Sequence, residues 1–263
     1  MSSIVSPDDI NPLEDHDQYM IVRNWSEVPP QATHLTMAKP MQSLAPLRDF
    51  QHLRHLRVFG GDALLDTLVP LPELCTLRLT AVPAKGLTSL EPLSNVPNLE
   101  RLILHHVPLV KSLGPLAHLE KLKDLLLEIS PASITTLHEL DSLQPLAGLR
   151  TLERLELRGI RVRELGLRPL EQMTWLRHLV VNNRFEIEDF ARLAAALPNT
   201  KGYCLHPAVP VGIPCDQCQQ DKLMLIGRTR PIMACPQCQA NHVERHIAKF
   251  QQCKAAYPIA ICP

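Results

Sequence analysis

The sequence predicts an α/β solenoid, with a parallel concave sheet, short helical segments on the convex side and a small metal-binding module after it. Two observations predict this fold. A short leucine motif recurs in phase through the middle of the chain, and two Cys-x-x-Cys pairs follow near the C-terminal end. Evenly spaced self-similarity is typical of stacked repeats, in which each unit buries its apolar face against the next one. We therefore expect one elongated stack with a small appended module.

The repeated motif is a leucine, two variable residues, a leucine, one variable residue and an apolar residue. It occurs six times, as Leu53-Leu56-Val58, Leu74-Leu77-Leu79, Leu99-Leu102-Leu104, Leu122-Leu125-Leu127, Leu152-Leu155-Leu157 and Leu176-Leu179-Val181. Each unit opens seven residues earlier with a Pro-Leu pair, or with Thr67-Leu68 in one unit, and the units start 21 to 30 residues apart. Alternate side chains of a strand point to opposite faces, so the leucines are expected to face the stack. The residues between them are expected to line the concave side.

This pattern resembles the leucine-rich repeat family, and in particular its bacterial internalin-like subclass with the rhythm P-L-x-x-L-x-x-L-x-x-L-x-L. The resemblance covers roughly residues 41–200 and implies a leucine-rich repeat solenoid. By family analogy it also implies an adaptor, a phosphatase-type regulator or a toxin-neutralising partner. The family places an asparagine three residues after the last strand leucine. Here those positions hold Gly61, Val82, Val107, Ser130, Ile160 and Arg184, so we expect no asparagine ladder and an irregular arc.

Both ends of the stack need caps, because an end repeat has only one neighbour. At the front, residues 19–22 and 34–37 are expected to form degenerate strands. At the back, residues 187–197 have helical periodicity, and residues 202–205 are expected to add a last strand. The predicted domains are an N-terminal acidic segment and cap (1–40), the solenoid (41–206), a stiff proline-containing linker (207–214) and a zinc-ribbon-like module with a C-terminal helix (215–263).

Composition restricts the class of function and the compartment. Of the 263 residues 45% are hydrophobic, and the 27 basic residues balance the 27 acidic ones, so no global field recruits nucleic acid or an anionic membrane. The N-terminus lacks the basic start and apolar run of a secretory signal, and no stretch of about 18 apolar residues could span a membrane. Cysteine pairs spaced for a metal favour a reducing compartment, so we expect a cytoplasmic protein.

The predicted concave face carries the candidate partner-binding residues. They are His55, Arg57, Phe59, Arg78, Arg101, Ile103, His105, Leu126, Arg154, Arg158, His178 and Val180. An arginine run (Arg57, Arg78, Arg101) beside exposed aliphatic side chains suits a protein partner, because interface cores favour apolar and arginine contacts. The alternative is that these are ordinary solvated strand residues. No nucleophile with an orienting partner emerges, Cys75 is expected to be a half-buried thiol, and we expect no enzyme.

Four cysteines have the spacing of a metal site. Cys215, Cys218, Cys235 and Cys238 form C-x2-C, sixteen residues, C-x2-C. This spacing is typical of a four-cysteine zinc site closed by a hairpin, with residues 222–225 and 231–234 as its strands. The module resembles a zinc ribbon, although the glycine often found after each second cysteine is Gln219 or Gln239 here. We expect one structural Zn²⁺; two disulfides or a redox dithiol remain alternatives.

A helix is expected over residues 240–252, with His242 and His246 on a solvated face. The module also offers basic groups for a nucleic acid. They are Lys222, Arg228, Arg230, Arg245, Lys249 and Lys254. With four zinc-bound thiolates the net charge of the module is only about +1. Affinity for nucleic acid rises with the number of phosphates neutralised, so the sequence gives only weak support to nucleic-acid binding as an alternative function. Cys204, Cys253 and Cys262 are spare thiols.

Overall fold

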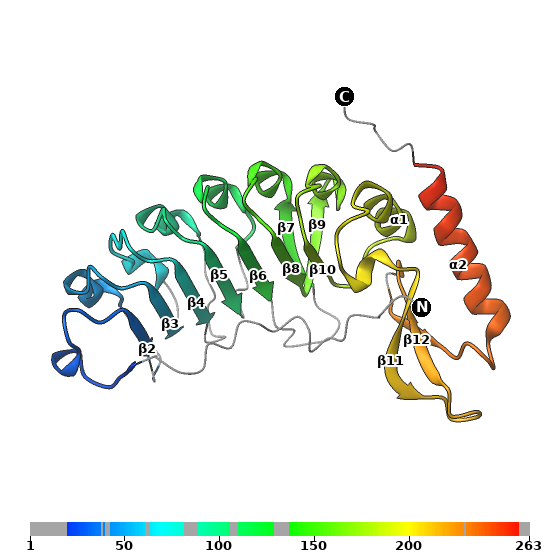
Figure 1. The fold of residues 1–263 in the computed structure, drawn as a ribbon, viewed down its shortest axis with the longest axis horizontal. Coiled ribbons are helices and arrows are strands. Elements are labelled where there is room, and N and C mark those ends of the chain that lie inside the picture. The colour runs from blue at the N-terminus through cyan, green and yellow to red at the C-terminus, as the bar shows by residue number, and fades with distance from the viewer. Residues whose placement is uncertain are drawn as a thin grey trace.

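The computed structural model describes residues 20–37, 39, 43–60, 64–81, 89–105, 110–128, 137–228 and 230–257. Eight parallel strands form one curved sheet in the order β1-β2-β3-β4-β5-β6-β8-β10. The sheet lines the inner side of an arc, and short helical turns follow its outer rim (Figure 1). The strands are β1 (Met20–Val22), β2 (His34–Met37), β3 (His55–Gly60), β4 (Thr76–Ala81), β5 (Arg101–His105), β6 (Asp124–Glu128), β8 (Arg154–Arg158) and β10 (His178–Val181). This confirms the predicted leucine-rich repeat solenoid.

The convex segments are 3₁₀ turns whose positions follow the prolines. Proline lies at the first or second position of five of them, where its fixed φ suits a helix start and its missing N–H costs nothing. These five turns are Ala45–Asp49, Glu91–Asn95, Gly114–His118, Gln144–Gly148 and Arg168–Gln172. The unit with Thr67 in place of proline has a shorter turn, Leu65–Thr67. The proline therefore correlates with the length of each convex turn.

Leucine packing forms the core, as the motif predicts. The strand leucines lie in register across the sheet, for example Leu56 beside Leu77 and Leu102 beside Leu125. All four have at most 1% of their surface exposed. A fully buried leucine contributes about 1.5–3 kcal/mol relative to an exposed one, so the stack as a whole is held by apolar burial.

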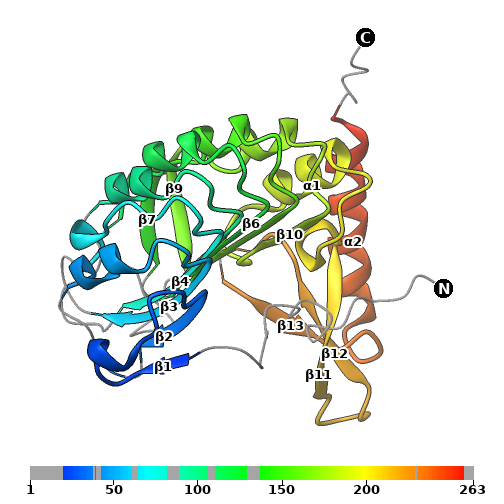
Figure 2. The ribbon, with the colours of Figure 1, turned by 60° about the vertical axis from the view of Figure 1, so that its left-hand side comes forward.

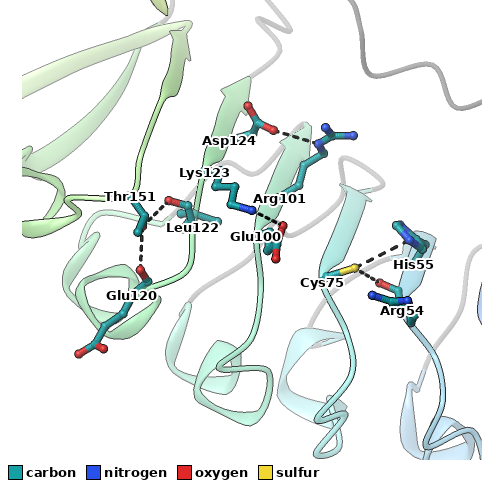
Figure 3. A network of polar contacts seen from close by, with 10 residues as sticks. All are labelled: Arg54, His55, Cys75, Glu100, Arg101, Glu120, Leu122, Lys123, Asp124 and Thr151. Atoms are coloured by element: carbon teal, nitrogen blue, oxygen red, sulfur yellow. Dashed lines mark hydrogen bonds and ion pairs between the residues drawn. The ribbon is translucent and has the colours of Figure 1, made fainter. Parts of the chain in front are cut away.

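Side chains on the convex side bond to the backbone of the preceding repeat. The Thr151 hydroxyl donates to the carbonyls of Glu120 and Leu122, at 2.7 and 2.9 Å (Figure 3). Trp175 Nε1 donates to Leu149 O at 2.9 Å, and Asn95 Nδ2 donates to Leu68 O at 2.7 Å. These bonds satisfy backbone carbonyls between repeats, which is the task of an asparagine ladder.

Two of the six positions at which the family places an asparagine, Ile160 and Arg184, lie in the described part of the chain. There the equivalent bonds come from Asn182 instead. Its amide accepts from the N–H of Ile160 and donates to the carbonyl of Ile160, both at 3.0 Å. The remaining four positions (Gly61, Val82, Val107 and Ser130) and Cys262 lie outside the described residues.

A second sheet was not predicted from the repeat pattern. Strands β7 (His138–Ser142) and β9 (Ile160–Glu164) pair in parallel on the flank of the arc (Figure 2). Ion pairs join them, from Arg161 to Glu139 and from Arg163 to Asp141, each at 3.0 Å. Strand β7 lies within the longest, 30-residue repeat interval, so the extra residues partly serve this pairing.

The caps agree with the predictions in part. Strands β1 and β2 open the stack, and helix α1 (Ile187–Ala196) closes it. The predicted strand at 202–205 is wrong, because Tyr203–Leu205 forms a 3₁₀ turn. Before it, Lys201 forms an isolated parallel bridge with His178 of β10. A Cβ on Gly202 would meet Leu179 O at 2.0 Å, so only glycine lets the backbone turn this close to the last strand.

Residues 207–214, predicted as a linker, instead form strand β11 (Ala208–Pro214). It pairs antiparallel with β12 (Asp221–Leu225), which in turn pairs with β13 (Ile232–Ala234). Pro210 and Pro214 are compatible with a strand here because β11 lies at the edge of its sheet and pairs irregularly between them. The predicted hairpin of the module and helix α2 (Ala240–Ala255) are confirmed, and α2 packs beside α1 (Figure 1).

Candidate functional site

The four cysteines of the C-terminal module come together in a metal-ligating arrangement. Their Sγ atoms all lie within 4.8 Å of one another. Cys218 Sγ is 3.4 Å from Cys235 Sγ, and Cys215 Sγ is 3.9 Å from Cys238 Sγ. In a tetrahedral zinc site with Zn–S bonds of about 2.3 Å the sulfur atoms are about 3.8 Å apart. A disulfide needs about 2.05 Å, so the geometry fits a metal and does not fit two disulfides.

A backbone N–H group favours the thiolate form of one of these cysteines, Cys235. The N–H of Cys238 contacts Cys235 Sγ at 3.4 Å, and this bond is the largest cause that lowers the pKa of Cys235 to about 6. Gln219 has φ +62°, the left-handed conformation that favours glycine. The first Cys-x-x-Cys turn therefore has the usual ribbon geometry although its glycine is replaced.

Asn183 connects this module to the repeat array. Its Nδ2 donates to Leu225 O at 2.7 Å, and its Oδ1 accepts from the N–H of Gly227 at 2.8 Å. Gly227 has φ +87°, and a Cβ there would lie 2.3 Å from Ile187 Cα at the start of α1. Only glycine allows this approach. Asn183 could not be identified from the sequence, because no local pattern relates it to a strand 42 residues away.

Helix α2 packs against both the ribbon and the end of the array. His246 was expected on a solvated face, but it is only 4% exposed, with Nε2 at 2.8 Å from Ile226 O and 3.1 Å from Pro207 O. The expectation was wrong because α2 packs its His246 face onto the three-stranded sheet. Lys249 Nζ binds Glu188 Oε1 of α1 at 2.8 Å. The module therefore covers the end of the stack.

Several of the basic groups that could contact a nucleic acid are engaged within the chain. Lys222 Nζ binds Asp216 Oδ2 at 3.0 Å, and Lys249 binds Glu188. Arg228 Nε is buried. Arg230 and Arg245 remain exposed. The basic footprint of the module is therefore smaller than the sequence alone indicates.

The concave face divides into columns set by the strand register. Arg57 lies beside Arg78, but Arg78 lies beside Ile103, and Arg101 lies beside Thr76 and Asp124. The predicted run of three arginines is therefore split. Arg57 and Arg78 share one column, and Arg101 belongs to another, because the side chains of a strand at i and i+2 point to the same face in separate columns.

From β5 onward the concave charges pair with each other. Arg101 Nε donates to Asp124 Oδ2 at 3.1 Å (Figure 3), and Arg154 Nε lies 3.6 Å from Asp124 Oδ1. His105 pairs with Glu128 at 3.2 Å, and Arg158 pairs with Glu156 at 2.9 Å. Burial, followed by the charge of Arg154, lowers the pKa of His178. This half of the face is therefore internally neutralised.

The aliphatic side chains of the face are less exposed than expected. Ile103 and Val180 are 4% and 2% exposed, and Leu126 is half-buried. Ile103 lies in register between Arg78 and Leu126, whose side chains flank it. Val180 lies on β10, next to the chain segment that follows α1 and bonds to that strand. Phe59, at 42% exposure, is a large apolar side chain that this face exposes to solvent.

Cys75, Cys204 and Cys253 lie outside the four-cysteine cluster and are partly or fully buried. Cys75 Sγ contacts Arg54 O at 3.2 Å and lies 3.8 Å from His55 Nε2 (Figure 3). It is half-buried, as expected. Cys204 is fully buried, and this burial raises its pKa to about 12, so its thiol stays protonated. Cys253 is half-buried on α2.

Comparisons with solved structures find proteins whose repeat architecture is similar to that of this chain. No protein-family model and no curated protein matches the chain. Internalin C2 of Listeria monocytogenes str. 4b F2365 matches with a TM-score of 0.47 and 21% identity, over 62% of this chain and 66% of that one. An internalin (inlF) of the same strain matches with a TM-score of 0.46 and 20% identity, over 66% and 54%. A leucine-rich repeat protein of Leptospira interrogans matches with a TM-score of 0.47 and 14% identity, over 70% and 57%.

The chain thus spans less than two thirds of the length of each of these proteins. The fold assignment rests on the parallel sheet and its in-phase leucines, not on these likenesses. Among the described residues, no helix has the length and apolar character needed to cross a membrane.

Proposed function

We propose that this chain is a non-enzymatic scaffold that binds a protein partner on the concave face of its leucine-rich repeats. One structural Zn²⁺ would hold the C-terminal ribbon, which caps the array. The observation that carries the proposal is the concave sheet itself. Its side chains project from strands whose leucines are fully buried, for example Leu56, Leu102 and Leu155 at 0% exposure.

A rigid face of this kind favours binding because few side chains and no backbone need to be ordered on association. The surface is mixed, with Phe59 and half-buried arginines beside polar groups, and interface cores favour aromatic and arginine contacts. The ion pairs of Asp124 and Glu156 on this face would set the orientation of a bound partner more than they would increase its affinity.

The metal proposal rests on the donor set. Four thiolates at tetrahedral spacing suit zinc and leave no open position for chemistry, so the ion would be structural. Thiols that must stay reduced to bind a metal also support the cytoplasm as the proposed location.

The test is a capture experiment with the full zinc-loaded chain. A photo-crosslinking amino acid at Phe59 reports on the concave face, and one at the exposed Gln51 reports on the convex side. We expect a crosslinked protein from the first position only, and we expect Arg78→Glu and Arg158→Glu to weaken its capture.

Equal crosslinking from both positions, with capture unchanged in both variants, would overturn the concave-face proposal. Retention on DNA or RNA that falls with salt and is abolished by Arg230→Gln would instead support the nucleic-acid alternative. The slope of affinity against salt reports the phosphates neutralised, so this measurement separates the two functions.

A further inference from the structure

A small hollow opens on the concave face at its N-terminal end. It measures ≈ 190 Å³, and its polar lining comes from Thr36 of β2, Arg57 of β3, and Arg78 and Thr80 of β4. Phe59 also lines this hollow, and it is 42% exposed. A pocket for a drug-sized ligand has about 300–1,000 Å³, so this hollow suits one side chain of a larger partner better than a free metabolite.

Thr36 supplies a polar atom to this hollow. Its Oγ1 is buried and makes no hydrogen bond within the part of the chain that the structure describes. Buried hydroxyls are nearly always hydrogen-bonded, because leaving one unpaired costs about 1–3 kcal/mol. A ligand atom that accepts from Thr36 would remove this cost, and an acceptor beside two guanidinium groups would be an anion.

The three strands around the hollow carry no carboxylate on their concave side. The concave positions of β2, β3 and β4 hold His34, Thr36, His55, Arg57, Phe59, Thr76, Arg78 and Thr80, with no acidic residue. Within the described ranges, Arg78 takes part in no ion pair. Farther along the sheet, the concave arginines Arg101, Arg154 and Arg158 each lie beside a carboxylate of this chain.

The contrast points to a missing counter-ion. The half-buried guanidinium of Arg78 is more strongly stabilised by a carboxylate than an exposed one would be, because water screens it less. The exposed ring of Phe59 beside the hollow would contact the stem of an acidic side chain.

We propose that this hollow is a subsite for one carboxylate side chain of an acidic segment in the protein partner. Arg78 and Arg57 bind the carboxylate, and Thr36 donates its hydroxyl hydrogen to it. The proposal deepens and rests on the proposed concave-face interaction, since it names the chemistry that this face recognises.

The test uses fluorescein-labelled hexaglutamate as the probe and the full zinc-loaded chain, with fluorescence anisotropy at low salt. Hydrogen bonds to charged groups contribute about 1.5–3 kcal/mol, so we expect Arg78→Gln to weaken binding about 10- to 100-fold. Thr36→Val keeps the shape of the side chain and should weaken binding about three- to tenfold, the loss expected for a neutral donor. Arg78→Lys should bind at an intermediate level, because lysine keeps the charge but not the planar fork.

The matched control is Arg161→Gln, which removes an arginine from the flanking strand β9, outside the concave sheet. It lowers the net charge as much as Arg78→Gln does, and it should leave the affinity for hexaglutamate unchanged. Thermal unfolding of each variant verifies that it is folded. A similar loss in Arg161→Gln and Arg78→Gln would show that only net charge attracts the probe and would overturn the subsite.

Two other outcomes would also overturn it by assigning the hollow to another occupant. Displacement of the probe by inorganic phosphate, but not by chloride at equal ionic strength, would assign it to a small anion. Binding that appears only after Asp8, Asp9, Glu14, Asp15 and Asp17 are changed to their amides would assign it to the acidic N-terminal segment of this chain.

The subsite and the proposed function can fail separately. A partner that crosslinks from Phe59 and is captured equally by wild type and by Arg78→Gln overturns the subsite alone. A partner whose capture no concave substitution changes overturns the concave-face function itself.

Discussion

The repeat array and the C-terminal ribbon lie against each other but are stabilised by different forces. One apolar cluster runs through the array from Val22 to Leu205. The ribbon has a small cluster of its own, with Leu225, Ala234 and Val243 buried. A core of this size does not stabilise an independent fold, and natural modules of this size use a metal or disulfides.

The ribbon also borrows stability from its neighbour. Ile226 and Phe250 belong to the cluster of the array and are fully buried in it. Asn183 and Gly227 add close polar and backbone contacts at the same junction. The array is therefore built around its own leucines, whereas the ribbon, with its small cluster, would depend on the proposed metal first and on the junction second.

The largest effect is expected from loss of a metal ligand. Cys235→Ser removes one of four thiolates, and structural zinc contributes about 10–16 kcal/mol to the folding of small zinc modules. We expect loss of bound zinc and fast hydrogen exchange in β11, β12 and β13, with protection retained in β3 to β8. Metal analysis and hydrogen-exchange mass spectrometry measure the two effects.

The control for that variant is Cys253→Ser, because Cys253 lies on α2 of the same module but outside the cluster. It should keep about one equivalent of zinc. Equal loss of protection in the array and the ribbon of Cys235→Ser would contradict the difference between the two regions.

The leucine motif predicted the strands of the array well, because a two-residue alternation of buried and exposed positions is a local property of each strand. Leu125 and Leu127 are buried on β6, and the residues on either side of each are more exposed, as the motif requires. The cysteine spacing predicted the cluster for the same reason, since each Cys-x-x-Cys pair closes its own turn.

Contacts between strands could not be predicted in the same way. Arg101 pairs with Asp124 and does not continue the column of Arg57 and Arg78. This pairing depends on the register between repeats of unequal length. Asn182 and Asn183 show the same limit, since one bonds within the array and the other bonds to the ribbon. A single step along the chain separates the two roles, and no local pattern tells them apart.

An intermediate effect is expected from the junction. Asn183→Ala removes the acceptor of Gly227 N–H and the donor to Leu225 O, both buried. A buried group left unsatisfied costs about 1–3 kcal/mol, so the ribbon should detach from the array more often while it keeps its zinc. Faster hydrogen exchange at β12 and at the start of α1, with unchanged zinc content, would verify this.

Asn182→Ala is the matched control for the junction, because it removes the bonds to Ile160 inside the array. It should increase exchange near β9 and leave β12 unchanged. If both variants increase exchange in β12 equally, Asn183 has no specific role in holding the ribbon.

The smallest effect is a pH dependence of the same junction. Burial is the largest cause that lowers the pKa of His246, and the nearby charges of Arg228 and His242 lower it further. The docked state therefore keeps His246 neutral, with Nε2 donating to Ile226 O. A detached helix would take up a proton at the ordinary pKa, so docking loses stability as the pH falls below about 6.5.

His246→Gln keeps an N–H donor but does not titrate, and in zinc-saturated protein its melting temperature should fall less than that of wild type between pH 7.5 and 5.5. His242→Gln, on a half-exposed position of the same helix, should follow the wild type. Because protonation of the cysteine ligands affects all three proteins alike, a common pH profile would show that His246 does not contribute to the pH dependence of docking.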